Sequence, residues 1–109
     1  SFLRGISVTE NIALLRRLWK EKLPFRLDVQ RTVKRLMVLE RENDHVLYGK
    51  TGLGQIDGVW YGWLVGFVER DGSAYCYALN ISSETATLEE IATLRHVLVR
   101  QLLQERKLL

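Results

Sequence analysis

The sequence predicts a single α+β domain, in which an antiparallel β meander of about three strands is flanked by N-terminal helices and by a C-terminal helix packed on the sheet. Three observations carry this prediction. Apolar residues recur at helical spacing near both ends of the chain. Runs of β-branched and aromatic residues, separated by glycine-containing turns, fill the middle. The 109 residues are 47% hydrophobic and 27% charged, as in one globular domain spanning residues 1–109.

Two helices are expected before the strands, and the first opens with a capping box of Ser7 and Glu10. Its apolar residues continue at helical spacing until Leu23, and Pro24 stops the run. Asp28 is the expected N-cap of the second helix. There the spacing predicts an apolar stripe of Val29, Val33, Leu36 and Met37 and a solvent face of Gln30, Arg31, Lys34 and Arg35.

The polar segment Glu40–His45 is expected to end the second helix. The strands that follow are Val46–Thr51, Val59–Arg70 and Ala74–Ile81. A connection over Gly52–Gly58 joins the first two, and Asp71-Gly72 makes a tight hairpin between the last two. The middle strand is apolar on both faces, with Tyr61, Trp63, Val65 and Phe67 on one and Trp60, Leu64 and Val68 on the other. Both faces should therefore be covered, and three strands are so few that we also expect self-association.

The last helix should begin at a second capping box, Thr87 with Glu90, and run to about Arg106. Its apolar stripe comprises Leu88, Ile91, Ala92, Leu98, Val99 and Leu102. A rotation of about 100° per residue puts Arg95 near the centre of this stripe. A guanidinium on the core side needs an anionic partner, so Arg95 either snorkels to water or pairs with Glu69 or another carboxylate.

The composition argues against several classes of protein. The net charge is +3 and the pI about 9.2, but basic and acidic residues alternate in Lys20–Lys22 and Glu105–Lys107, so a nucleic-acid-binding face is not expected. Cys76 is the only cysteine, which excludes an internal disulfide or a thiolate metal site. No apolar run reaches the ~20 residues of a membrane span, and no secretory leader is recognisable at the start.

The tripeptide Gly49–Thr51 invites comparison with a phosphate-binding loop. Asp44 stands where that motif requires a glycine, and no helix is expected to follow, so we reject nucleotide binding. On a strand Lys50 and Thr51 point to opposite faces, yet both can border one cleft if the strand twists or bulges at a flanking glycine. An ammonium beside a hydroxyl suits an anion such as a carboxylate, and Gly52 allows a flat ligand close to the backbone.

Other candidate side chains are weaker. His45 lies in a polar turn and is expected to be solvated, and His96 lies at the border of the apolar face of its helix. Neither has a partner for metal binding or nucleophilic catalysis, so no metal site is expected. Aromatic residues occupy both faces of the strands, which favours core packing over a stacking platform for single-stranded nucleic acid.

Three segments, Tyr48–Gly52 with its Lys-Thr-Gly triad, Gly62–Gly66 and Ala78–Ile81, follow the order and spacing of a known family. Together they resemble the substrate-binding edge of the penicillin-recognising serine enzymes, most of all the class D β-lactamases and the related β-lactam sensor domains. The resemblance runs from Ile6 to the last helix and implies a partial β-lactamase or transpeptidase-like fold. Because no Ser-x-x-Lys motif occurs, it implies the C-terminal portion of such a domain.

The resemblance implies roles for five residues. Lys50 and Thr51 line the site with Gly52 and bind the β-lactam carboxylate. The backbone N–H of Leu53 matches the second donor of the oxyanion hole, and Arg95 holds the substrate carboxylate bidentately. In the intact family the nucleophile is a serine activated by a lysine three residues later. This chain has neither, so it contains no catalytic residue and should not hydrolyse β-lactams alone.

The resemblance further implies a periplasmic or extracellular protein that needs no cofactor. Its expected partners are a β-lactam, the N-terminal half of the same domain and, for the chain alone, further copies in an oligomer or swapped assembly. The intact domain either hydrolyses the acyl intermediate as an enzyme or keeps it as a sensor. A different class of function also stays open, a small α+β interaction module in which Lys-Thr-Gly is only a turn and Arg95 only a structural ion pair.

Overall fold

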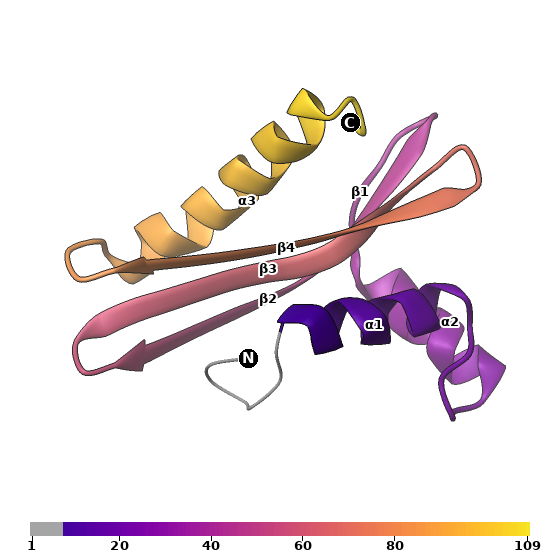
Figure 1. Cartoon of the computed structure of the whole chain (residues 1–109), viewed down its shortest axis with the longest axis horizontal. Helices are drawn as coiled ribbons and strands as arrows, with labels where there is room; N and C mark the ends of the chain where they lie inside the picture. Colours follow the sequence, from indigo (N-terminus) through magenta and orange to yellow (C-terminus); the bar gives the residue numbers. More distant parts are fainter. Residues whose placement is uncertain (1–7) are drawn as a thin grey trace.

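The computed structural model describes residues 8–109, which form three helices and one antiparallel sheet of four strands (Figure 1). The elements are α1 (Val8–Trp19), α2 (Leu27–Leu36), β1 (Val38–Arg41), β2 (His45–Ile56), β3 (Val59–Arg70), β4 (Ser73–Ser83) and α3 (Leu88–Glu105). The strands lie in sequence order, β1-β2-β3-β4. The predicted α+β meander is confirmed, with one more strand than expected. Within residues 8–109 no helix is both long and apolar enough to cross a bilayer.

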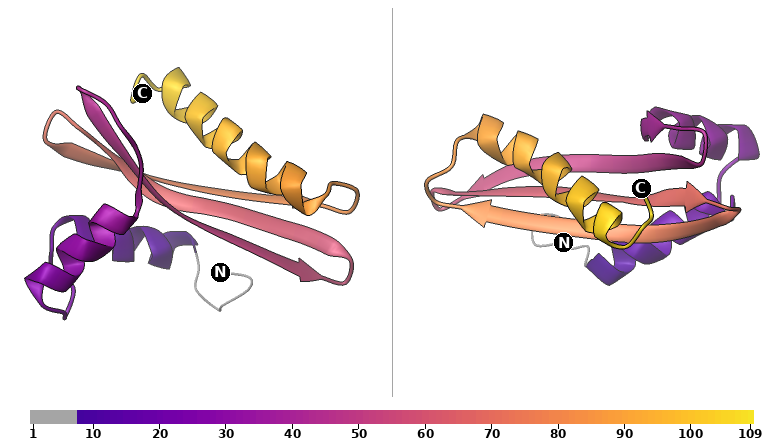
Figure 2. Two further views of the ribbon diagram at one scale, coloured as in Figure 1. Left: turned by 180° about the vertical axis from the view of Figure 1, so that it is seen from behind. Right: turned by 90° about the horizontal axis from the view of Figure 1, so that it is seen from above.

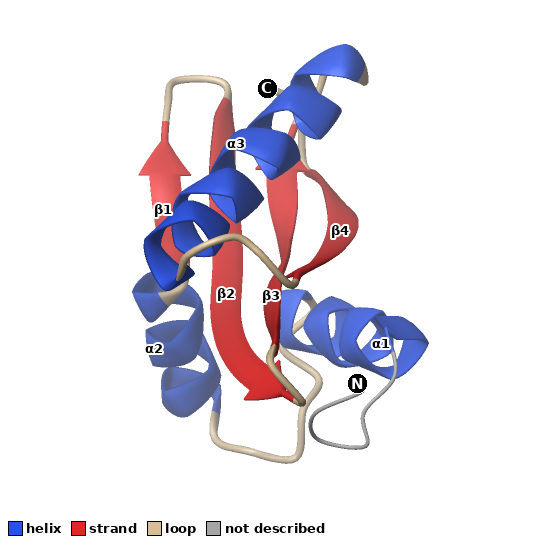
Figure 3. Ribbon diagram, turned by 90° about the vertical axis from the view of Figure 1, so that its left-hand side faces the viewer, coloured by secondary structure: helices blue, strands red, loops and turns tan. Residues whose placement is uncertain are grey.

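Helices cover the sheet on both faces, as the two apolar faces of β3 predict. Helix α3 lies on one face and α1 on the other (Figures 1 and 2), and Figure 3 shows α3 running across the strands. The core under α3 includes Leu47, Leu64, Val68, Tyr77, Val99 and Leu103. The core on the α1 side comprises Leu15, Leu18, Met37, Tyr48, Val65 and Phe67. Alternate residues of each strand therefore serve different cores.

Both long hairpins close with two-residue turns. Asp57-Gly58 has φ values of 50° and 80°, and Asp71-Gly72 has φ values of 54° and 76°, which suits the twist of the flanking strands. The second hairpin is where the sequence predicts it. The first is a correction, because β2 pairs with β3 without interruption up to Ile56, and most of the expected connection Gly52–Gly58 is therefore strand.

The N-terminal helices begin and end at other residues than predicted. Helix α1 ends at Trp19, and the chain turns at Glu21, which has a φ of 59°. Ser7, the expected cap of α1, lies outside the described residues. In α2, Arg26 occupies the N-cap position but its side chain makes no capping hydrogen bond to the helix backbone, and Asp28, the predicted cap, lies in the first turn. At the other end of the molecule, α3 has the predicted capping box at Thr87.

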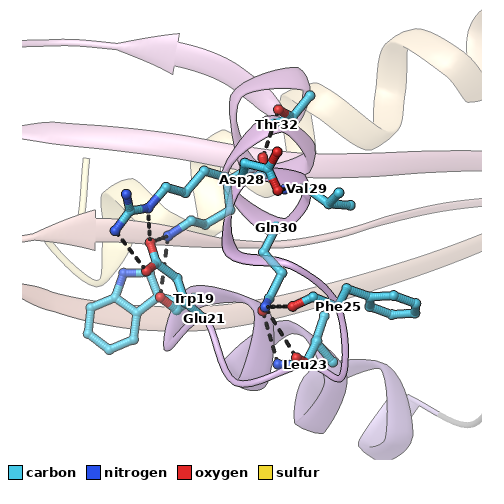
Figure 4. A network of polar contacts seen from close by, with 10 residues as sticks. Trp19, Glu21, Leu23, Phe25, Asp28, Val29, Gln30 and Thr32 are labelled. Atoms are coloured by element: carbon cyan, nitrogen blue, oxygen red, sulfur yellow. Dashed lines mark hydrogen bonds and ion pairs between the residues drawn. The ribbon is translucent and has the colours of Figure 1, made fainter.

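Helix α2 packs with a different face from the one predicted (Figure 4). Gln30, expected in solvent, is only 3% exposed. Its side-chain amide accepts a hydrogen bond from the Leu23 N–H (2.9 Å) and donates to the carbonyls of Leu23 (3.2 Å) and Phe25 (2.8 Å). These bonds hold the α1–α2 connection against the helix. Of the predicted stripe Met37 is buried, whereas Val29, Val33 and Leu36 are exposed.

Strand β1 is the element that the sequence analysis missed. It pairs with Val46–Tyr48 of β2, and its last two residues, Glu40 and Arg41, belong to the polar segment that was expected to end the second helix. Half-buried and exposed side chains alternate along its four residues. A strand this short is stabilised by its ladder with β2 rather than by its own composition, so local patterning did not indicate it.

Candidate functional site

Strand β2 has an open edge over its second half. β1 pairs with it only over Val46–Tyr48, and one further bond runs from the Gly49 N–H to the Met37 carbonyl (2.8 Å). Beyond that point no other described strand flanks β2 on this side. Backbone groups alternate in direction along an antiparallel strand, so the N–H and C=O of Thr51 and Leu53 point the same way as those of Gly49. They face the open edge of the sheet.

The side chains of Lys50 and Thr51 leave β2 on opposite faces. Lys50 is paired with Val65 of the α1-side core, and Thr51 is paired with Leu64 of the core under α3. The β2–β3 register is unbroken, so no bulge brings the two side chains to one face. Lys50 is exposed, and its ammonium donates to the Thr51 carbonyl (3.0 Å). This bond places the positive charge at the open edge.

Arg95 approaches the same segment from the α3 face. It is 9% exposed, and its Nη1 donates to the Gly52 carbonyl (3.1 Å). Its Nε–H is buried and has no hydrogen-bond partner within residues 8–109. Burial lowers the pKa of the guanidinium, which remains a cation at neutral pH. Glu69, a partner considered from the sequence, instead accepts a bond from Trp19 Nε1 (2.7 Å). Arg95 therefore keeps a buried donor for an anion.

Gly52 is required by the sheet itself. A Cβ at this position would lie 1.8 Å from the indole of Trp63, which covers the α1 face of the segment. Because the indole occupies that space, any side chain at position 52 would displace it from the strand. Leu53 follows with a partly exposed side chain and an outward N–H.

The five predicted site residues thus lie around one short stretch of β2. Lys50 reaches the edge from the α1 face, and Arg95 reaches the Gly52 carbonyl from the α3 face. Two cations and outward backbone N–H groups suit an anionic ligand. Among residues 8–109 no group of histidine, cysteine or acidic side chains is arranged to hold a metal ion.

An apolar groove beside this edge was not predicted. Its volume is about 880 Å³, and it lies between α1, α2 and β2. Lys50 and Thr51 border it, and most of the lining is apolar, including Leu14, Leu18, Phe25, Val33, Leu36 and Val65. Sequence reasoning missed the groove because it placed the apolar stripe of α2 in the core. The signal in the sequence that could have indicated the groove was the apolar stripe of α2, because its exposed residues form part of the groove wall.

The two histidines lie outside the anion-binding edge. His45 was expected in solvent, but it is buried, with Nε2 at 3.2 Å from Glu40 Oε1 and Nδ1 at 2.9 Å from Asp44 Oδ1. Arg100 of α3 pairs with Glu40, so this network ties the β1–β2 hairpin to α3. The pKa of His96 is lowered by burial and by the charge of the preceding arginine. The described structure gives neither ring a catalytic partner.

Comparisons with known proteins identify the family of the chain. The sequence profile of the penicillin binding protein transpeptidase domain matches residues 7–104. The chain is 40% identical over 101 residues to β-lactamase OXA-20 of Pseudomonas aeruginosa, covering 92% of this chain and 35% of that protein. It is 34% identical over 80 residues to regulatory protein BlaR1 of Bacillus licheniformis, covering 72% of this chain and 13% of that protein.

Solved structures give the same result. The chain superposes on FUS-1 (OXA-85), a class D β-lactamase from Fusobacterium nucleatum subsp. polymorphum, with a TM-score of 0.83 and 33% identity, covering 95% of this chain and 42% of that one. The chain spans about a third of the length of OXA-20. It belongs to the penicillin binding protein transpeptidase domain family and corresponds to the C-terminal part of a class D β-lactamase-like domain.

Proposed function

We propose that the chain forms the substrate-binding part of a class D-like serine domain that binds and hydrolyses β-lactam antibiotics. The N-terminal half of the same domain supplies the nucleophilic serine and the base lysine. One observation carries this proposal. Arg95 is buried with one N–H group bound to the Gly52 carbonyl and another without a partner among residues 8–109, beside an open strand edge that carries Lys50.

In this proposal the ligand carboxylate lies where the two cations approach the strand. Arg95 offers its buried Nε–H and the remaining guanidinium donors, Lys50 offers its ammonium, and Thr51 offers its hydroxyl. Gly52 contributes its carbonyl, which holds Arg95, whereas the space of its missing side chain is filled by the Trp63 indole and is not open to the ligand. No metal ion or cofactor takes part.

Leu53 contributes through its backbone. Negative charge appears on the lactam oxygen only when the serine attacks and the tetrahedral intermediate forms. A fixed N–H at that oxygen stabilises the transition state by roughly 3 kcal/mol. The Leu53 N–H faces the open edge and is the donor that this chain contributes, and the N–H of the serine is the other.

The N-terminal half covers the apolar groove in this proposal. Lys50 and Thr51 form a polar border of the groove, and most of the lining from α1 and α2 is apolar. Covering those walls would remove apolar surface from water and bring the serine to the open edge. By resemblance to its relatives, the assembled domain acts in the periplasm or outside the cell.

A split-domain experiment tests the proposal. The chain is refolded with the N-terminal region of OXA-20 that precedes the matched segment and then exposed to a fluorescent penicillin. We expect covalent labelling of the one-to-one complex and none of the chain alone. Arg95→Ala should slow labelling by about tenfold to a hundredfold, because it removes a charged hydrogen-bonding partner. Arg100→Ala, on the same helix but paired with Glu40, should label at nearly the normal rate.

The opposite outcome is equally informative. A folded one-to-one complex that stays unlabelled would contradict the proposal and favour a small interaction module. A sensor domain is the second candidate, because the chain is also similar to regulatory protein BlaR1. Release of the label distinguishes the two, since an enzyme hydrolyses the acyl group and a sensor keeps it.

A further inference from the structure

Tyr77 makes a buried contact that the proposed site does not use. It lies on β4 and is 5% exposed, and its hydroxyl donates to the Tyr48 carbonyl of β2 (2.6 Å). The bond spans the whole width of β3, because the register places Tyr77 opposite Gly66 and Gly66 opposite Gly49. A side chain of β4 therefore reaches a strand that is not its neighbour.

Glycine at two positions makes this crossing possible. A Cβ at Gly49 would lie 2.7 Å from the Tyr77 hydroxyl, and a Cβ at Gly66 would lie 2.0 Å from the Tyr48 carbonyl oxygen. Either side chain would occupy the space of the hydroxyl or of its acceptor. The hydrogen bond therefore depends on three residues that lie side by side on β2, β3 and β4, namely Gly49, Gly66 and Tyr77.

The acceptor lies where β2 loses its outer neighbour. Tyr48 is the last residue of β2 that pairs with β1, and the open edge begins after Gly49. Four residues later, the Gly52 carbonyl accepts its bond from Arg95. Both donors come from the α3 side, so they hold β2 immediately before and immediately after Lys50 and Thr51. Between these two bonds the strand has a ladder on one side only.

We infer that Tyr77 is a positioning residue for the Lys50–Leu53 segment, an inference that rests on the proposed function of that segment. Its hydroxyl anchors the peptide group at the start of the open edge and thereby sets the direction of the Lys50 side chain and of the Leu53 N–H. Burial raises the pKa of Tyr77 well above its usual range, so the hydroxyl remains a donor at physiological pH.

Amide hydrogen exchange of the whole chain tests the anchor directly. Tyr77→Phe keeps the ring and removes the hydroxyl. The N–H groups of Lys50 and Gly52 point toward β3 by strand alternation and should be protected. We expect both to exchange about threefold to tenfold faster in the variant, with little change between β3 and β4.

Two controls separate anchoring from general loss of stability. Tyr75→Phe removes an exposed hydroxyl from the same strand and should leave the exchange rates unchanged. Leu79→Ala removes apolar packing under α3 and should accelerate the slow amides of all strands together. If Tyr77→Phe gives the uniform pattern of Leu79→Ala, or no change at all, the inference is wrong.

Acylation of the split domain by the fluorescent penicillin tests whether the loss of the Tyr77 hydroxyl also affects function. In a wild-type complex that reacts with penicillin, Tyr77→Phe should lower the maximal acylation rate about threefold to tenfold, whereas Tyr75→Phe should not. Faster amide exchange at Lys50 and Gly52 without a lower acylation rate would contradict the positioning role. If the wild-type complex does not react but exchange accelerates locally, the proposed function fails while Tyr77 still anchors the strand.

Discussion

Helices α2 and α3 both carry apolar side chains at helical spacing, but only α3 buries a stripe along its length, although Leu88 of the predicted stripe is exposed and Leu103 is buried in addition. In α3, Ile91, Val99 and Leu103 pack on the sheet, and each is at most 3% exposed. In α2, Leu36 is 81% exposed, and the buried position belongs to Gln30. Periodicity therefore shows which residues share a face of a helix, while the surrounding surface decides whether that face is covered.

The buried polar residue of each helix sharpens the contrast. Both the oxygen and the nitrogen of the Gln30 side-chain amide are bonded to backbone groups of the α1–α2 connection, so its role is structural. Arg95 has one bond to the Gly52 carbonyl and a buried Nε–H without a described partner. Buried polar groups are normally satisfied, so the Nε–H of Arg95 keeps hydrogen-bonding capacity that the Gln30 amide does not, and this is why the proposed site places the ligand there.

The largest loss of stability is expected in α3, where the apolar side chains are buried against the sheet. Ile91→Ala should lower the free energy of unfolding by about 2–5 kcal/mol, because it leaves a cavity where α3 meets the sheet at Gly62. Urea denaturation measures this loss. Leu36→Ala on α2 should change stability by less than about 0.5 kcal/mol. Equal losses in the two variants would contradict the difference between the helices.

The next largest loss of stability is expected at Gln30, the buried polar residue of α2. Gln30→Ala should lower the free energy of unfolding by about 1–3 kcal/mol, because backbone groups of the α1–α2 connection lose their partners while partly buried. Thermal unfolding measures the loss. The exposed Arg35 on the same helix gives the control, since Arg35→Ala should have little effect. If Gln30→Ala left the stability unchanged, the α1–α2 connection would not be held by these bonds.

A smaller effect is expected at the helix starts. Thr87→Ala removes the cap of α3 and should cost about 1 kcal/mol, whereas Asp28→Ala in α2 should cost less, because Asp28 is not an N-cap. Chemical denaturation of both variants makes the comparison. A greater loss from Asp28→Ala would mean that α2 depends on its first turn more than the geometry indicates.

The same capping box predicts a pH dependence. Hydrogen bonds from the Thr87 backbone and side chain lower the pKa of Glu90 below its ordinary value of 4.5. Stabilisation by the ionised form is therefore complete above the unfolded pKa and is lost as the pH falls through the lowered folded pKa. Glu90→Gln should be less stable than the wild type at pH 7, and the gap should close as the pH falls from the unfolded pKa through the lowered folded pKa. A gap that is constant with pH would contradict this assignment.

The smallest change in stability is expected in the exposed apolar stripe of α2. Leu36→Ser should leave the free energy of unfolding within about 0.5 kcal/mol of the wild type, because the side chain is already in water. It should nevertheless reduce self-association, since contiguous exposed apolar residues favour contact between copies. Analytical ultracentrifugation of both proteins measures this. A wild-type chain that remains monomeric at high concentration would contradict the predicted oligomer.

The sequence analysis succeeded where structure depends on near neighbours. The Asp71-Gly72 hairpin and the Thr87 capping box were predicted at the residues where they occur. It failed where a distant segment decides the outcome. The end of β2 was placed too early because glycines usually indicate a loop, whereas Gly52 lies in the strand beneath Trp63. His45 was placed in solvent because one of its two carboxylate partners, Glu40, lies on β1, a strand that was not predicted.

By itself, the sequence determined the class of fold, the last helix with its central arginine, and the position of the Lys-Thr-Gly segment on a strand. These features follow from local periodicity, turn chemistry and a short motif. Only the tertiary structure decided that Lys50 and Arg95 reach this segment from opposite faces and that the stripe of α2 stays open. The reason is physical, since burial and hydrogen-bond partners are properties of surfaces that meet only after the chain has folded.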